Sequence, residues 1–254
     1  MQHINNDGDV NNSKRKSLKN IGSNLNFAAS ESYKRLRTNI FFSLENKDDD
    51  LGYAIGVTSS VRGEGKSTTS INIAYALAES GKHVILLECD LRLPVMAKNL
   101  DIELKPGLSE FIVGLCKSEE AIRPSLVHPN LDVVPAGSIP PNPSELLGTK
   151  RFKNILKAFQ KVYDFVIIDL PPVSSVSDAL VVASDVDGMI VVVRQNLCTQ
   201  SLLGDTMRQL SVVKEKILGF VYNGAGSESK RYGKKYYKYG YGYGNKHRKS
   251  GSEN

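Results

Sequence analysis

The sequence predicts an α/β protein built on a doubly wound, mostly parallel sheet with helices on both faces and flexible tails at both ends. Segments with strand patterns and helix patterns alternate along the central part of the chain. Several strand segments, such as 165–168 and 189–193, are continuous apolar runs rather than alternating ones. Such runs are typical of parallel strands that are covered on both faces.

The elements follow one another in a regular order. A first helix is expected at 31–44, after Ser30, because apolar residues recur there at roughly helical spacing. A solvated connector (46–51) follows it. The expected strands are 54–58, 83–88, 131–135, 165–169, 188–193 and 217–222. The expected helices are 67–80, 144–163 (more than one helix), 178–183 and 199–214, with a loop region before 131.

Charge is concentrated in the two ends of the chain. Residues 227–254 carry eight basic and two acidic residues, and residues 1–29 carry four basic and two acidic residues. The body, 30–226, has 21 basic and 23 acidic residues. The sequence therefore predicts three parts: a disordered segment (1–29), a folded domain (30–226) and a disordered tail (227–254). Because the basic excess lies outside the folded domain, we expect no nucleic-acid partner.

Cysteine and apolar patterning indicate a cytosolic protein. The three cysteines are widely spaced and form no CxxC pair, and the four histidines show no metal-ligand spacing. No signal-peptide pattern opens the chain, and no apolar run approaches the ~18 residues that span a bilayer. We expect any membrane connection to come through a partner or through surface electrostatics.

A phosphate-binding loop is predicted after the strand at 54–58. The loop reads SSVRGEGKST, and an amphipathic stretch follows it. Gly63 and Gly65 let backbone N–H groups converge on an anion, and the start of a helix adds further donors. In such loops the lysine, here Lys66, reaches the β- and γ-phosphates, and the next hydroxyl, Ser67, ligates Mg²⁺. The alternative is a turn without a ligand. The expected nucleotide-binding residues are Arg62, Gly63, Glu64, Gly65, Lys66, Ser67 and Thr68.

Acidic residues end two other predicted strands. One apolar run continues into ECDLRLP, which carries Glu88, Asp90 and Arg92, and the run FVII continues into DLPP, which carries Asp169. In open α/β sheets, ligands lie outside the carboxyl ends of the strands, so these carboxylates should converge near the phosphate loop. Oxygen ligands and a triphosphate together predict a Mg²⁺ site. The alternative is that each acidic residue merely caps a helix.

As a set, these motifs resemble those of the bacterial tyrosine kinases of capsular and exopolysaccharide synthesis. SSVRGEGKST, LLECDLRLP and FVIIDLPPV are similar to the three nucleotide motifs of that family, and GSIPPNPSELL (137–147) also matches. Glu31-x-x-Lys34-x-x-Arg37, in the helix at 30–45, looks like the family's oligomerisation signature. The resemblance covers about residues 30–243. Two positions depart from the pattern: Glu88 stands where Asp is usual, and Lys34 stands where Arg is usual.

The resemblance implies an ATP-dependent protein-tyrosine kinase that phosphorylates its own tail and regulates polysaccharide synthesis and export. It implies ATP and Mg²⁺ as cofactors, with the metal held by Ser67, Asp169 and Asp90. Asp90 is our first choice, and Glu88 our second, for orienting or deprotonating the tyrosine, and Arg92 would steady charge beside them.

Asn223 has two interpretations. It follows the last predicted strand, at the place where related nucleotide-binding folds read the base. The alternative is a turn residue without contact to the nucleotide.

The tail is rich in tyrosine. Six of the eleven tyrosines lie between positions 232 and 243, separated mainly by glycine and lysine, a composition that cannot form a core. Without the nucleotide site, an aromatic and basic surface for single-stranded nucleic acid would be favoured. With it, the tyrosines are interpreted as phosphoacceptors: Tyr232, Tyr236, Tyr237, Tyr239, Tyr241 and Tyr243.

The resemblance also implies partners and a location. They are a ring-like homo-oligomer, the cytoplasmic tail of a separate transmembrane activator, a cognate tyrosine phosphatase, and a cytoplasmic position at the inner face of the plasma membrane. A different class remains open, a partition- or positioning-type ATPase that binds DNA or membrane. Those ATPases carry a second lysine five residues before the invariant one, where this chain has Val61. A third hypothesis is a regulatory scaffold whose ATP site sets only the oligomeric state.

Overall fold

The computed structural model describes residue 18, residues 20–44 and residues 51–225. The chain divides into two units, residues 1–223 and residues 224–254, and nearly all described residues belong to the first. The tyrosine-rich tail and most of the predicted N-terminal disordered segment lie outside the described residues.

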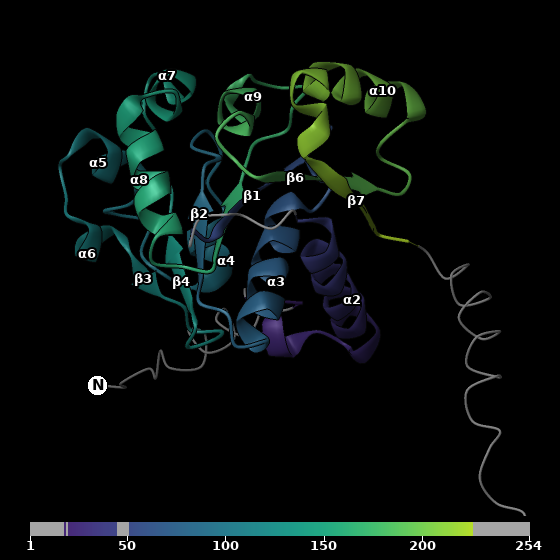
Figure 1. Ribbon diagram of the computed structural model, residues 1–254, viewed down its shortest axis with the longest axis horizontal. Helices are drawn as coiled ribbons and strands as arrows, with labels where there is room; N and C mark the ends of the chain where they lie inside the picture. The colour runs from purple at the N-terminus through teal and green to yellow at the C-terminus, as the bar shows by residue number, and fades with distance from the viewer. Residues whose placement is uncertain (1–17, 19, 45–50, 226–254) are drawn as a thin grey trace, which may run out of the picture. The chain divides into compact units, whose positions relative to one another are not determined.

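A seven-stranded sheet forms the centre of the first unit (Figure 1). Its strand order is β3-β4-β2-β5-β1-β6-β7, and every neighbouring pair is parallel except β3 and β4. This confirms the predicted doubly wound, mostly parallel sheet. The strands are β1 (Tyr53–Ser59), β2 (Val84–Glu88), β3 (Arg123–Pro124), β4 (Leu131–Val134), β5 (Phe165–Asp169), β6 (Gly188–Arg194) and β7 (Ile217–Asn223).

Alternating side chains of the central strands build two separate cores. In β5, Phe165 and Ile167 join one apolar cluster, whereas Val166 and Ile168 join the other. The first cluster lies under α2 (Phe27–Ser43), α3 (Lys66–Glu79) and α4 (Met96–Leu100). The second lies under α5 (Leu108–Val113), α6 (Ser118–Ala121), α7 (Pro143–Leu147), α8 (Lys150–Gln160), α9 (Asp178–Ala183) and the 3-10 segment η2 (Leu210–Lys216). The last α-helix is α10 (Gln200–Gln209).

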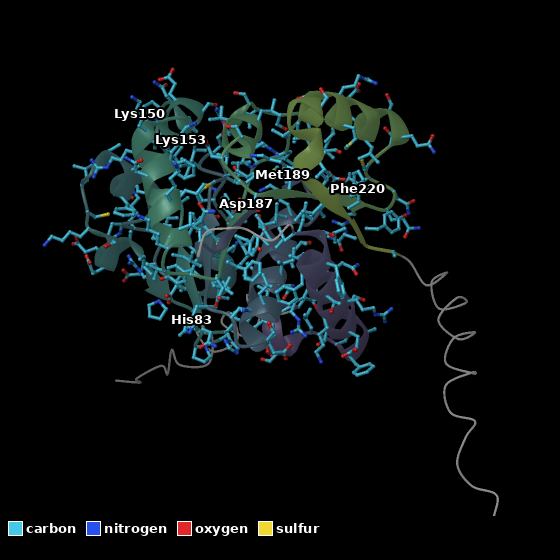
Figure 2. All side chains as sticks on the ribbon, in the orientation of Figure 1. His83, Lys150, Lys153, Asp187, Met189 and Phe220 are labelled. Carbon is cyan, nitrogen blue, oxygen red and sulfur yellow. The ribbon has the colours of Figure 1, made fainter. Side chains whose placement is uncertain are left out.

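The sheet is buried unequally from its centre to its edge. Met189 on β6 is completely buried, whereas Phe220 on the edge strand β7 is half exposed (Figure 2).

No helix in the described part of the chain is long and apolar enough to cross a membrane.

Helix α3 is buried on nearly all sides, although the sequence predicted an amphipathic helix there. Ile71, Ile73 and Leu77 are almost completely buried. The reason is α2, which packs along α3 (Figure 1) and donates a hydrogen bond from Arg37 Nη1 to the carbonyl of Ala76 at 2.8 Å. Because α2 lies against α3, the face of α3 that points away from the sheet is buried instead of exposed to water.

Order begins earlier than the sequence predicted. Helix α2 starts at Phe27 rather than at 31, because the Asn26 side chain accepts a hydrogen bond from the backbone N–H of Ala29 and caps the helix. Before it, Ile21 is buried, and the backbone N–H of Gly22 donates to Asn72 Oδ1 of α3 at 2.9 Å. Residues 20–29 therefore differ from the expected disorder, since composition does not reveal a packing partner some fifty residues away.

The short elements between β2 and β4 were not predicted. Helices α4, α5 and α6 have only four to six residues each, and β3 has two. Such lengths show no usable periodicity. The region predicted as helical at 144–163 consists of α7 and α8, and the one at 199–214 consists of α10 and most of η2.

Candidate active site

The three sequence motifs meet at the carboxyl end of the sheet. Asp169, the last residue of β5, is in register with Val57 of β1 on one side and with Glu88 of β2 on the other. The phosphate loop follows β1 directly. The predicted convergence of the strand-end residues with the loop is therefore present in the fold.

The phosphate loop turns into α3 through two glycines with positive φ. Gly63 has φ 84° and Gly65, the N-cap of α3, has φ 91°. Both angles lie in the left-handed region, which side chains other than hydrogen rarely adopt. A Cβ at position 65 would also lie 2.2 Å from Asn223 Nδ2. The loop thus presents the start of a 14-residue helix, the usual anion-binding arrangement.

Glu64 holds the loop from inside. Its side chain is completely buried, and its carboxylate accepts hydrogen bonds from the backbone N–H of Val61 at 2.8 Å and of Arg194 at 3.1 Å. The Arg194 guanidinium in turn donates to the carbonyl of Gly63 at 2.8 Å. The Glu64 side chain is therefore a support of the loop, and the sequence interpretation missed its partner Arg194. The available signal was that Arg194 is a charged residue at the end of an apolar strand, at the same edge of the sheet as the phosphate loop.

Asn223 lies against the same loop. Its Nδ2 donates to the carbonyl of Glu64 at 2.8 Å. The end of β7 thus touches the phosphate loop, and Asn223 is more than a turn residue. Its predicted contact with the base stays a prediction.

The remaining predicted loop residues differ in exposure. Arg62 is exposed, Ser67 is buried, and Thr68 is partly buried at the start of α3. Their contacts with a nucleotide stay predictions.

Lys66 is the centre of a charge cluster. Its ammonium lies 2.7 Å from Asp90 Oδ2, 3.8 Å from Asp169 Oδ1 and 3.4 Å from Ser67 Oγ. Burial alone lowers the pKa of Lys66, but Asp169 and Asp90 outweigh that effect and raise it above its ordinary value. The lysine therefore carries its charge at neutral pH, and both carboxylates lie beside it.

Asp169 has the character of a cation ligand. It is completely buried, and burial raises its pKa although Lys66 opposes the shift. Its Oδ1 accepts a hydrogen bond from Ser70 at 3.2 Å, whereas its Oδ2 has no hydrogen-bond partner in the described part of the chain. A buried carboxylate oxygen without a donor, near a serine hydroxyl, fits Mg²⁺, which prefers oxygen ligands.

No group of three or more His, Cys, Asp or Glu side chains within residues 20–44 and 51–225 forms a metal cage. Mg²⁺ bound with a triphosphate does not need one, because one or two carboxylates, water and the phosphates complete its shell. Ser67 and Asp169 are the residues that would hold it, and a contact between Asp90 and the metal stays a prediction.

Glu88 has a different environment from Asp90. It is completely buried, and its Oε1 accepts hydrogen bonds from the backbone N–H groups of Val95 at 2.6 Å and Met96 at 2.7 Å. Its Oε2 accepts a third from Ala136 at 3.1 Å. Burial raises the pKa of Glu88 to about 7, while the three N–H donors oppose the shift. The carboxylate therefore links the loop after β2 to the segment after β4. Its predicted catalytic role stays a second choice.

Arg92 pairs with a residue that the motifs did not single out. Its Nε and Nη2 lie 2.9 Å and 3.2 Å from the two carboxylate oxygens of Asp178, whose side chain is fully buried. Its Nη2 also reaches Ser144 Oγ at 3.4 Å, and Ser144 donates to Asp178. Arg92 thus joins the second motif to α9 and α7. Among the interactions of the described residues, it has no contact with Lys66 or Asp169.

The predicted oligomerisation residues lie on α2, away from this edge. Lys34 pairs with Glu31 at 3.0 Å on the helix surface, and Arg37 binds the carbonyl of Ala76. The six predicted acceptor tyrosines lie outside the described residues.

Comparisons with known proteins agree with this geometry. A model of the AAA domain family matches residues 53–218. Tyrosine-protein kinase YwqD of Bacillus subtilis (strain 168) is 35% identical over 195 residues, which cover 77% of this chain and 81% of that protein. The kinase domain of the Escherichia coli tyrosine kinase ETK has a TM-score of 0.71 and 30% identity, with 78% of each chain covered.

The alternative class is less similar. The septum site-determining protein MinD of Pyrococcus horikoshii, solved in complex with Mg-ADP, has a TM-score of 0.59 and 26% identity, with 69% of this chain and 72% of that chain covered. The positioning-type ATPase hypothesis is therefore less well supported than the kinase. From its domain match, its identity to YwqD and its three converging motifs, the chain belongs to the bacterial tyrosine-protein kinases.

Proposed function

We propose that the chain transfers the γ-phosphoryl group of ATP to tyrosine hydroxyls, first of all to those of its own segment 232–243. The observation that carries this proposal is the cluster in which Lys66 lies between Asp90 and Asp169 at the start of α3. Phosphoryl transfer depends on positioning and on neutralisation of charge. At this edge of the sheet, a cation and a helix N-terminus can neutralise phosphate charge, and two carboxylates lie beside them.

Each residue of the cluster has a distinct role. Lys66 binds the β- and γ-phosphates, and the phosphate loop holds the triphosphate through its backbone N–H groups. Ser67 and Asp169 would hold Mg²⁺, which would supply positive charge to the phosphate oxygens.

Asp90 orients the acceptor and takes its proton. A tyrosine hydroxyl has a pKa of about 10, so at neutral pH it attacks only as a base removes its proton. Asp90 is slightly exposed at the cluster, whereas the carboxylate of Glu88 is completely buried and accepts three backbone hydrogen bonds. This difference favours Asp90 over Glu88 as the base.

Family membership supports a proposal for the wider role. We propose that the chain regulates capsular or exopolysaccharide synthesis and export as a homo-oligomer at the inner face of the plasma membrane. There it would be activated by the cytoplasmic tail of a separate membrane-spanning protein and reset by a tyrosine phosphatase. The basic tail, with eight basic and two acidic residues, is consistent with a location beside an anionic leaflet.

Incubation with Mg·ATP, with and without the activator tail, tests the kinase assignment. We expect phosphotyrosine within 232–243 by phosphosite mapping, and none in Lys66→Met under the same conditions. ATP hydrolysis without phosphotyrosine, in both the presence and the absence of the activator tail, would instead favour the positioning-type ATPase.

A further inference from the structure

Helix α8 carries positive charge on its outer side. Lys150 (Figure 2), Arg151 and Lys157 lie on the helix, Lys161 follows as its C-cap, and all of them are exposed, whereas the helix contains no acidic residue. Lys157 and Lys161 lie about two and three turns beyond Lys150, so these three positions fall within roughly 40° of one another around the helix axis. These four residues are here called the basic face.

The charge of the basic face is not compensated within the described part of the chain. No ion pair there involves a side chain of the basic face, whereas the neighbouring Lys153 pairs with Asp185 at 3.0 Å. Glu110, the acidic residue of the adjacent helix α5, accepts hydrogen bonds from the backbone N–H groups of Gly107 and Ser138 instead. The basic face therefore presents free positive charge to its surroundings.

An exposed apolar turn lies against one end of the basic face. Gly114 ends α5, and a Cβ at that position would lie 2.7 Å from Arg151 Nη2, so the turn and the guanidinium are in contact. Val113 and Leu115, on either side of Gly114, are 54% and 80% exposed. Cations next to exposed aliphatic side chains suit the boundary between lipid headgroups and acyl chains.

We propose that the basic face binds the surface of an anionic lipid bilayer. The proposal rests on the membrane location proposed above for its choice of lipid, and it adds a direct contact of this chain with the bilayer to the contact that a membrane-spanning partner would supply. It does not depend on phosphoryl transfer.

The composition of the basic face favours lipid over other polyanions. The exposed residues among its cations are Asn154 and Ala158, so the face offers no aromatic ring for stacking on nucleic-acid bases. It also lacks the large central side chains on which protein interfaces depend. Its three lysines are point charges without the planar fork with which arginine binds phosphate in a fixed geometry. Headgroups in a fluid bilayer require charge but no fixed geometry.

The position of the basic face is compatible with assembly through α2. Phe152 and Phe159 of α8 belong to one core cluster and Ile40 of α2 to the other, so the two helices cover opposite faces of the sheet. Each cation beside an anionic leaflet strengthens binding about fivefold, so a single chain would bind reversibly. Several basic faces in one oligomer would bind the same membrane far more tightly. Membrane binding would thus favour the assembled form.

Co-sedimentation of the full-length chain with vesicles tests the proposal. Because residues 227–254 are themselves basic, their eight Lys and Arg residues are changed to Gln in the parent and in every variant used for binding. Vesicles of equal parts phosphatidylglycerol and phosphatidylcholine are compared with vesicles of phosphatidylcholine alone. We expect the parent to bind only the anionic vesicles. Lys150→Gln/Lys157→Gln should lower the partition coefficient at least tenfold, since two cations are lost.

Two control variants separate a local contact from net charge. Lys150→Arg/Lys157→Arg keeps the charge and should bind as the parent does. Lys98→Gln/Arg208→Gln removes the same charge from exposed residues of α4 and α10, and we expect its partition coefficient to stay unchanged. Thermal melts show whether each variant is folded. Equal binding of Lys150→Gln/Lys157→Gln and its parent, or an equal loss in Lys98→Gln/Arg208→Gln, would overturn the proposal.

Two further measurements separate this proposal from its alternatives. With the natural tail and without vesicles, Lys150→Gln/Lys157→Gln should form phosphotyrosine as the wild type does. Vesicle binding without phosphotyrosine in the wild type would refute the kinase function and leave the membrane surface intact. A duplex DNA that binds the parent at lower concentration than the anionic lipid does, with the same loss in the variant, would replace lipid by nucleic acid and overturn the proposal.

Discussion

The ammonium of Lys66 lies 2.7 Å from Asp90 Oδ2, and this pair joins the phosphate loop to the second acidic motif. Both side chains are mostly buried, with 12% and 9% exposed. A bound γ-phosphate must therefore share the ammonium with Asp90. A phosphate that draws the ammonium away would leave Asp90 Oδ2 without its partner, as the proposed contact of Asp90 with the acceptor hydroxyl requires.

Lys66→Met is expected to abolish phosphotyrosine and also to destabilise the fold. The substitution leaves Asp90 and Asp169 buried without their shared cation, which costs about 3 kcal/mol of unfolding free energy. Phosphotyrosine blots and urea denaturation measure the two effects. Adding Asp169→Asn should restore much of the stability without restoring activity. A single variant as stable as the wild type would show that the ion pair contributes little to folding.

Glu88→Asp is expected to lower kcat at least tenfold and to lower the melting temperature. The shorter side chain cannot reach Val95, Met96 and Ala136 together, and each backbone N–H left unpaired in the interior costs about 1–3 kcal/mol. Glu88→Gln keeps the length and an acceptor oxygen, so it should retain more activity than Glu88→Asp. The opposite order, with Asp equal to the wild type, would indicate that Glu88 acts as a metal ligand or base.

Asp169→Asn should remove activity without loss of stability. The substitution replaces a buried charge by a neutral group of the same shape, and Lys66 keeps its partner Asp90. We expect the rate to fall roughly a hundredfold or more, and the Mg²⁺ concentration at half-maximal rate to rise. Titration of activity with Mg²⁺, beside a thermal melt, measures both. Ser70→Ala is the control, because it removes the hydroxyl that bonds Asp169 and the Lys66 carbonyl but keeps the carboxylate itself. An unchanged Mg²⁺ dependence would exclude Asp169 as a ligand.

The sheet and the meeting of the three motifs were predictable because their signals are local. Apolar runs such as 165–168 mark strands buried on both faces, and the residue that ends each run falls at one sheet edge. Asp169 and Asp90 are brought beside Lys66 by these rules alone. The phosphate loop was likewise visible as glycines between a strand and a helix.

The roles of Glu88, Arg92 and Glu64 were not predictable, because their partners lie far along the chain. Glu88 binds Ala136, 48 residues away, Arg92 binds Asp178, 86 residues away, and Glu64 binds Arg194, 130 residues away. A motif gives the chemistry of a side chain but not the direction in which it points. Both acidic residues of the three, Glu64 and Glu88, proved to bind backbone N–H groups.

Substitutions on helix α2 can separate an effect on oligomer assembly from an effect on folding stability. Glu31 and Lys34 pair with each other at the helix surface, whereas Arg37 binds the carbonyl of Ala76 on α3. We expect Glu31→Ala/Lys34→Ala to lower the oligomer mass with an unchanged melting temperature. Arg37→Ala should lower both, since it also removes an internal hydrogen bond worth about 1 kcal/mol. Light scattering and thermal melts measure these effects. An unchanged mass in both variants would make α2 a packing element only.

Asn223→Ala separates support of the phosphate loop from recognition of the base. Asn223 Nδ2 donates to the carbonyl of Glu64 at 2.8 Å and lies against Gly65. If support is its role, the loss loosens the loop under any triphosphate, so the affinities for ATP and GTP should fall by the same factor, severalfold in each case. Competition of both nucleotides against a fluorescent analogue gives the two constants. Asn223→Asp should be weaker still, because a carboxylate faces the Glu64 carbonyl without a proton to donate. A fall confined to ATP, which changes the ratio of the two affinities, would instead assign Asn223 to the adenine base.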